Sequence, residues 1–192
     1  MEAFLVSAGV VALAEVGDKT QLLAIVLAAR FRRPVPIILG ILVATLVNHA
    51  LAGAIGRWLM LVVGPTRMRW VLAASFLAMA AWILVPDRAE DGDAAPRRYF
   101  GVFGTTVVAF FLAEMGDKTQ FATIALAARF PSVWMVVAGT TVGMMVANVP
   151  AVLLSGRLAG RLPVRLVHAV AAIIFALLGA LLLLAPPDGL LG

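Results

Sequence analysis

The stretch Glu15-Val-Gly-Asp-Lys-Thr-Gln21 decides how this chain folds, because it returns 99 residues later as Glu114-Met-Gly-Asp-Lys-Thr-Gln120. The similarity extends beyond the motif: residues 13–31 and 112–130 are identical at 14 of 19 positions. A match of this length at one fixed offset indicates an internal duplication. We therefore expect two copies of one structural unit, each carrying one copy of the motif.

Each motif lies inside a long apolar segment. Between Phe4 and Ala29 the only charged residues are those of the first motif, and between Val102 and Ala128 they are those of the second. About 20 apolar residues suffice to cross a bilayer. One charge at the centre of a spanning helix costs roughly 2.5–3.5 kcal/mol on insertion scales. The three charges of each motif therefore need partners from elsewhere in the bundle.

The composition of the chain also indicates a membrane protein. Of the 192 residues, 63% are hydrophobic and only 13% are charged, and the mean hydropathy is +1.06. These values exclude an ordinary soluble domain and predict an integral membrane protein in a lipid bilayer. Cysteine is absent, which excludes disulfides and thiolate metal sites. A pI near 11.0 would suit nucleic acid, but 13 of the 15 basic residues are arginines gathered at the ends of apolar segments. We therefore expect no nucleic-acid partner.

The sequence predicts an all-α integral membrane protein with six transmembrane helices. Residues 1–86 form the first three-helix repeat, residues 87–99 a polar linker, and residues 100–192 the second repeat. Because three is odd, the second repeat enters the membrane from the opposite side, so the repeats are inverted, as in many secondary transporters. The expected apolar segments are Phe4–Ala29, Val35–Ile55, Trp70–Val85, Val102–Ala128, Val133–Leu154 and Val164–Ala185.

The distribution of arginine predicts the orientation. The side that holds the linker carries nine loop arginines, against four on the other side. Because cytoplasmic loops are enriched in basic residues, we expect a cytoplasmic linker and both termini outside, in the cell (inner) membrane.

The helix through each motif has two expected forms. In a continuous helix, Glu15, Asp18 and Lys19 share one face, as do their counterparts in the second motif, while Thr20 and Thr119 point elsewhere. The motif glycine weakens a helix by about 1 kcal/mol relative to alanine. A local break there would free backbone carbonyls as additional ligands, which a membrane tolerates only beside a cavity or other protein.

Together the two motifs hold four carboxylates and two lysines, a sum of −2 that matches one divalent cation. Carboxylate and amide oxygens suit calcium, manganese or magnesium better than zinc or copper. Carboxyl groups packed in a low dielectric favour proton uptake once the cation leaves, so cation and protons compete for the same oxygens, as in an antiporter. The candidate metal ligands are Glu15, Asp18, Gln21, Glu114, Asp117 and Gln120, with Lys19 and Lys118 balancing charge and Thr20, Thr119, Asn48 and Asn148 as candidate site-lining residues.

The doubled motif resembles the signature of the Gdt-type family, which includes transmembrane protein 165 and belongs to the lysine-exporter superfamily. The resemblance covers nearly the whole chain and implies a secondary transporter, not an enzyme, that moves Mn²⁺ or Ca²⁺ out of the cytosol against protons without a prosthetic group. It implies metal binding by the two motifs. The residues that carry it are Glu15, Gly17, Asp18, Lys19, Thr20, Glu114, Gly116, Asp117, Lys118 and Thr119.

Other interpretations stay open at this point. The motif lysines could form purely structural pairs with the glutamates four residues before them. Paired membrane aspartates also suit an intramembrane aspartyl protease, and broken helices suit an amino-acid exporter. His49 and His168 have no counterpart in the other repeat, and we expect neither to be a ligand. The Gly139-x-x-x-Gly143 spacing predicts close packing within the bundle or the face of a homodimer.

Overall fold

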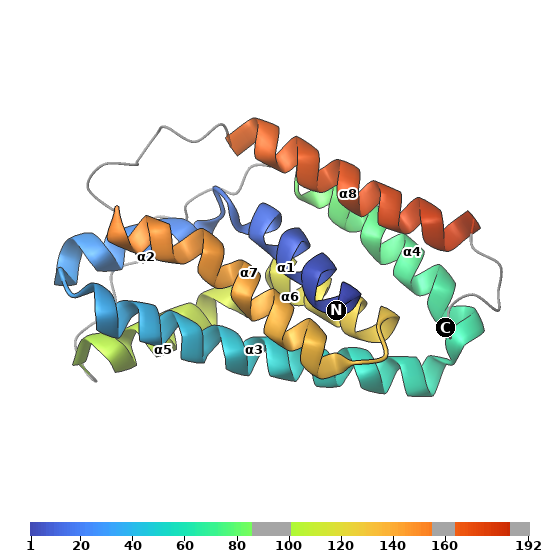
Figure 1. Cartoon of the computed structure of the whole chain (residues 1–192), viewed down its shortest axis with the longest axis horizontal. Helices are drawn as coiled ribbons and strands as arrows, with labels where there is room; N and C mark the ends of the chain where they lie inside the picture. The colour runs from blue at the N-terminus through green and yellow to red at the C-terminus, as the bar shows by residue number, and fades with distance from the viewer. Residues whose placement is uncertain (86–100, 155–163, 185–192) are drawn as a thin grey trace.

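The computed structural model describes residues 1–85, 101–154 and 164–184, and every regular element in these ranges is an α-helix (Figure 1). The prediction of an all-α protein is confirmed for this part of the chain, whereas the predicted linker at residues 87–99 lies outside the described residues. The helices are α1 (Glu2–Glu15), α2 (Lys19–Phe31), α3 (Pro34–Val63), α4 (Pro65–Trp82), α5 (Gly101–Glu114), α6 (Lys118–Arg129), α7 (Val133–Leu153) and α8 (Val164–Leu184).

Both segments that carry a motif are broken at the motif. The first breaks between α1 and α2 and the second between α5 and α6. Gly17 and Gly116 adopt φ angles of 81° and 77°, a left-handed conformation that glycine reaches without steric penalty. Asp18 and Asp117 follow as the N-cap residues of α2 and α6, a position that aspartate favours. The expected local break is therefore confirmed, and a continuous helix through the motif is wrong.

Within the described ranges two helices, α3 and α7, are long and apolar enough to cross a membrane by their length and composition. By contrast, α1 has 14 residues and α2 has 13. At 1.5 Å per residue each is only about 20 Å long, which is short of a hydrocarbon core of about 30 Å.

The structure has buried apolar clusters, but it also exposes large apolar side chains and buries several charged ones. Large apolar side chains such as Trp58 and Trp134 are exposed, whereas the charged side chains of Glu15, Glu114 and Lys118 are buried. This distribution, together with the apolar helices, is consistent with a membrane protein.

The helix with each motif packs against the long helix of the other repeat. α1 lies along α7, and α5 lies along α3. In the first pair Gly139 contacts the backbone of Phe4 and the side chain of Ser7, and in the second Gly40 contacts the corresponding Phe103 and Thr106. These two sets of contacts are related by the same offset of 99 residues as the motifs. The two pairs of helices therefore pack in the same way.

The glycines in α7 pack within the chain. Gly139 and Gly143 lie directly against the backbone of α1, at Phe4 and Ala8. The expected close packing is therefore confirmed, and the alternative of a dimer face at these glycines is wrong, because α1 covers them.

Candidate cation site

Two crossed ion pairs bring the motifs together. Lys118 Nζ lies 3.3 Å from Asp18 Oδ1, and Lys19 Nζ lies 3.4 Å from Asp117 Oδ1. Each pair joins the lysine of one motif to the aspartate of the other. Lys19 thus pairs across the repeats and not with the glutamate of its own helix segment, so its interpretation as a local structural pair is wrong.

The two ion pairs differ in exposure. In the Lys118–Asp18 pair both side chains are 1% exposed. In the other pair the side chain of Asp117 is 4% exposed, but that of Lys19 is 37% exposed. The first pair is therefore sealed in the bundle, where losing one partner is costly. The second reaches the protein surface through Lys19.

Each motif glutamate ends its helix and receives a hydrogen bond from the threonine five residues later. Thr119 Oγ1 donates to Glu114 Oε2 at 2.8 Å, and Thr20 Oγ1 donates to Glu15 Oε1. The expectation from a continuous helix, that the threonines point elsewhere, is wrong because the break at the glycine rotates the following turn. The threonines thereby face the carboxylates.

The second oxygen of each glutamate has no donor. Glu15 Oε2 and Glu114 Oε1 are buried and lack a hydrogen-bond partner among the residues that the structure describes. Asn148 Nδ2 donates to the other oxygen of Glu15 at 3.0 Å, and Asn48 Nδ2 donates to the carbonyl of Phe111 at 3.1 Å. A buried carboxylate oxygen without a partner is unfavourable unless a cation or a proton meets it. The site thus offers one such oxygen from each motif.

The acidic groups form a single electrostatic cluster. The charges of Glu15 and Glu114 lie close enough to repel each other, and Asp117 repels both glutamates. Lys19 partly offsets this repulsion at Glu114. Because like charges in a low dielectric repel strongly, the cluster favours the entry of positive charge.

The motif glutamines stabilise the helix breaks. Gly17 N–H donates to Gln21 Oε1 at 2.9 Å, and Gly116 N–H donates to Gln120 Oε1 at 2.8 Å. Gln21 Nε2 also donates to the carbonyl of Ala147 in α7 at 3.1 Å. These bonds satisfy backbone groups that the breaks leave unpaired. A cation bound by the glutamine oxygens would have to share them with the glycine N–H groups.

The aspartates face ammonium groups in this arrangement. Within the described ranges, no group of three or more acidic or histidine side chains is gathered in a geometry that could hold a metal. A cation that used the aspartates would therefore displace the lysines from them. The charge-balancing role expected for Lys19 and Lys118 fits this position.

One contact at the first break was not anticipated from the sequence. His168 Nε2, from α8, lies 2.6 Å from the carbonyl oxygen of Val16 and can donate a hydrogen bond to it. The break frees this carbonyl, and the histidine satisfies it. Nothing in the sequence signals the contact, because the two residues are 152 positions apart.

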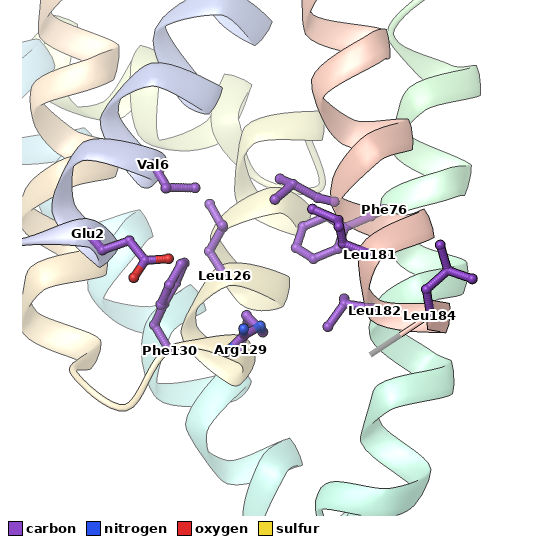
Figure 2. Close-up of a pocket in the computed structure, with 10 residues that line it drawn as sticks. Glu2, Val6, Phe76, Leu126, Arg129, Phe130, Leu181, Leu182 and Leu184 are labelled. Carbon is purple, nitrogen blue, oxygen red and sulfur yellow. The ribbon is translucent and has the colours of Figure 1, made fainter. Parts of the chain in front are cut away.

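A cavity of about 390 Å³ lies away from the motifs, between α1, α4, α6 and α8 (Figure 2). Its walls are mainly leucine and phenylalanine, and its charged lining residues within the described chain are Glu2 and Arg129. No motif residue lines it. An apolar cavity with this lining does not suit a hydrated divalent cation.

Buried carboxylates paired with lysines at two broken helices, inside a bundle with an apolar exterior, indicate a membrane transport protein. The chain belongs to the divalent cation/proton antiporter GDT1 family, whose model matches residues 3–91 and 102–188. The family resemblance inferred from the motif is thus confirmed. Each matched region contains one copy of the motif. Because the family model describes antiporters, the chain is classed with transport proteins.

Several known protein sequences are similar to this chain. A Vibrio cholerae protein named "Putative manganese exporter" is 46% identical over 93% of this chain and 88% of its own length. A Synechocystis protein named "GDT1-like protein sll0615" is 31% identical over 92% of this chain and 94% of its own. The rice "GDT1-like protein 3" is 26% identical over 91% of this chain and 71% of its own length. No solved structure matches the chain significantly.

Proposed function

We propose that this protein exports Mn²⁺ in exchange for protons through one site shared by the two motifs. The observation that carries the proposal is a pair of buried carboxylate oxygens, Glu15 Oε2 and Glu114 Oε1, that have no donor among the described residues. Two such oxygens in one cluster suit a divalent cation when it is bound and two protons when it has left. The aspartates complete the oxygen ligands.

The lysines act as exchangeable counter-ions in this proposal. Lys118 and Lys19 hold the aspartates at 3.3 and 3.4 Å, and the arriving cation displaces them. The four carboxylates and two lysines sum to −2, so one divalent cation neutralises the cluster. Two protons restore the same neutrality after the cation leaves. Exchange of one Mn²⁺ for two protons is therefore electrically silent.

Manganese is the proposed substrate, and calcium is its competitor. The oxygen ligands of the motifs suit either ion. The name of the relative from Vibrio cholerae, which is 46% identical to this chain, supports manganese.

The proposed architecture is six spans in two inverted repeats, in which α1–α2 and α5–α6 each form one broken span. The crossed ion pairs and the matching glycine contacts, which repeat at an offset of 99 residues, support this arrangement. The arginine distribution favours a cytoplasmic linker and external termini in the cell membrane.

Two alternatives receive less support. An aspartyl protease needs two aspartates that share a proton, but each aspartate here faces a lysine of the other motif. An amino-acid exporter would need a site for a carboxylate and an amine, whereas the family that the chain belongs to exchanges divalent cations for protons.

The proposal is tested by reconstituting the purified protein into lipid vesicles and imposing a pH gradient. We expect Mn²⁺ to accumulate in the acidic compartment as that compartment loses protons, and calcium to inhibit this uptake. We also expect an imposed membrane potential to leave the rate unchanged, because the exchange is electrically silent. Mn²⁺ accumulation that does not depend on the pH gradient would refute proton exchange. A transport rate that depends steeply on the membrane potential would refute the exchange of one Mn²⁺ for two protons.

A further inference from the structure

The packing gives His49 a counterpart in the other repeat. Gly40 and Gly139 occupy equivalent places, because their contacts in α5 and α1 are related by the same offset of 99 residues. From these glycines, α3 and α7 continue as unbroken helices for nine residues to His49 and Asn148. The counterpart of Asn148 is therefore His49. The sequence expectation that His49 has no counterpart is wrong, and Asn48 lies one position away from the equivalent place.

The place that His49 occupies is beside the second motif. Its counterpart Asn148 donates a hydrogen bond to Glu15 at the end of α1. On the other side of the site, Asn48 contacts Phe111 in α5, three residues before Glu114. Gly56 lies against Ile124 and Ala127 in α6. Residues 48–56 of α3 thus pass along the break between α5 and α6, where Glu114 ends its helix.

His49 has unused bonding capacity at this place. The side chain is fully buried, and neither ring nitrogen has a hydrogen-bond partner in the described part of the molecule. Glu114 Oε1 is also buried without a donor. A buried polar group of this kind normally has a partner. His49 in α3 and Glu114 at the end of α5 therefore both have buried polar atoms without a partner in the described part of the chain, at helices that pack against each other.

We propose that His49 supplies a nitrogen ligand to the transported cation on the Glu114 side and thereby selects Mn²⁺ over Ca²⁺. Calcium takes oxygen ligands almost exclusively, whereas imidazole is a good ligand for first-row transition metals. In the first half, Asn148 presents an amide at the same place, so the two halves of the site differ in chemistry. This inference rests on the proposed function, because it assigns a further ligand to the same site.

The direct test is pulsed electron paramagnetic resonance of Mn²⁺ bound to the purified full-length protein. The chain has two histidines, so labelling histidine with the heavy nitrogen isotope identifies any nitrogen bound to the metal. We expect nitrogen modulation that changes with the label, disappears in His49→Asn and persists in His168→Asn. Asparagine is the matched replacement because Asn148 fills the equivalent place.

The preference for manganese gives a second readout. We expect His49→Asn to lower the ratio of Mn²⁺ to Ca²⁺ affinity by at least about tenfold, as loss of a metal-site partner does. Bound Mn²⁺ without histidine modulation in the native protein would overturn the inference and leave the proposed function intact. Absence of Mn²⁺ binding altogether would overturn both. The native protein decides the question even if His49→Asn does not fold.

Discussion

Replacing either Glu15 or Glu114 by glutamine is expected to abolish proton-driven Mn²⁺ exchange. Each glutamate contributes one buried oxygen that no donor from the described part of the chain meets. Glutamine at either position can neither carry the negative charge nor bind and release a proton. Since even an outer-shell partner of a metal is worth about 10–100-fold, we expect the initial rate of Mn²⁺ uptake into vesicles to fall by at least about 100-fold.

The matched control for this prediction is Glu2→Gln. It makes the same chemical change in α1, but Glu2 is exposed and lies outside the motif. We expect this variant to exchange at the native rate. If Glu15→Gln and Glu114→Gln also exchanged normally, the glutamates would not belong to the transport site.

Removing the buried lysine is expected to destabilise the protein far more than removing the exposed one. Lys118→Met leaves the carboxylate of Asp18, which is 1% exposed, without its lysine partner, and loss of one partner of a buried ion pair costs about 3–5 kcal/mol. We expect Lys19→Met to cost less, because the Lys19 side chain is 37% exposed and exposed ion pairs contribute less to stability than buried ones. Unfolding in detergent, followed by tryptophan fluorescence, measures both.

A double variant separates charge from packing in this comparison. Adding Asp18→Asn to Lys118→Met also removes the negative charge that faced the lysine, so we expect part of the lost stability to return. Equal losses of stability in Lys118→Met and Lys19→Met would contradict the stronger contribution expected of the buried Lys118–Asp18 pair. Failure of the double variant to recover would mean that packing of the lysine stem, and not its charge, stabilises the site.

Much of the fold follows from local sequence features. The apolar segments predict the helices, and Gly17 and Gly116 mark the two breaks, because glycine reaches a positive φ without steric penalty. The fixed offset of the motifs also predicts repeated packing, which the contacts of Gly40 and Gly139 display. The helices and their breaks depend only on residues that are close together in the chain, whereas the repeated packing follows from the duplication.

The contacts inside the site could not be predicted in the same way. Helical periodicity relates residues within one continuous helix, so it predicts that Thr20 points away from Glu15 and leaves a local Lys19–Glu15 pair as an alternative. The break rotates the threonine toward the carboxylate, and the lysine crosses to Asp117.

The histidine counterpart was missed for a different reason. Asn48 lies 33 residues after the start of the first motif, and Asn148 lies 34 residues after the start of the second. The two asparagines are therefore one position out of register. On a helix, one residue is a rotation of about 100°, which places a side chain on another face. Only the contacts between helices identify His49 as the counterpart.

The number of Mn²⁺ ions bound by each chain tests the central claim most directly, because the claim is that two motifs form one site. Mn²⁺ binding to the purified protein, titrated by electron paramagnetic resonance, is expected to saturate at one ion per chain, and Glu15→Gln or Glu114→Gln alone is expected to remove it. Saturation at two ions, or one ion retained in either variant, would show that each motif binds its own cation and would contradict the shared site.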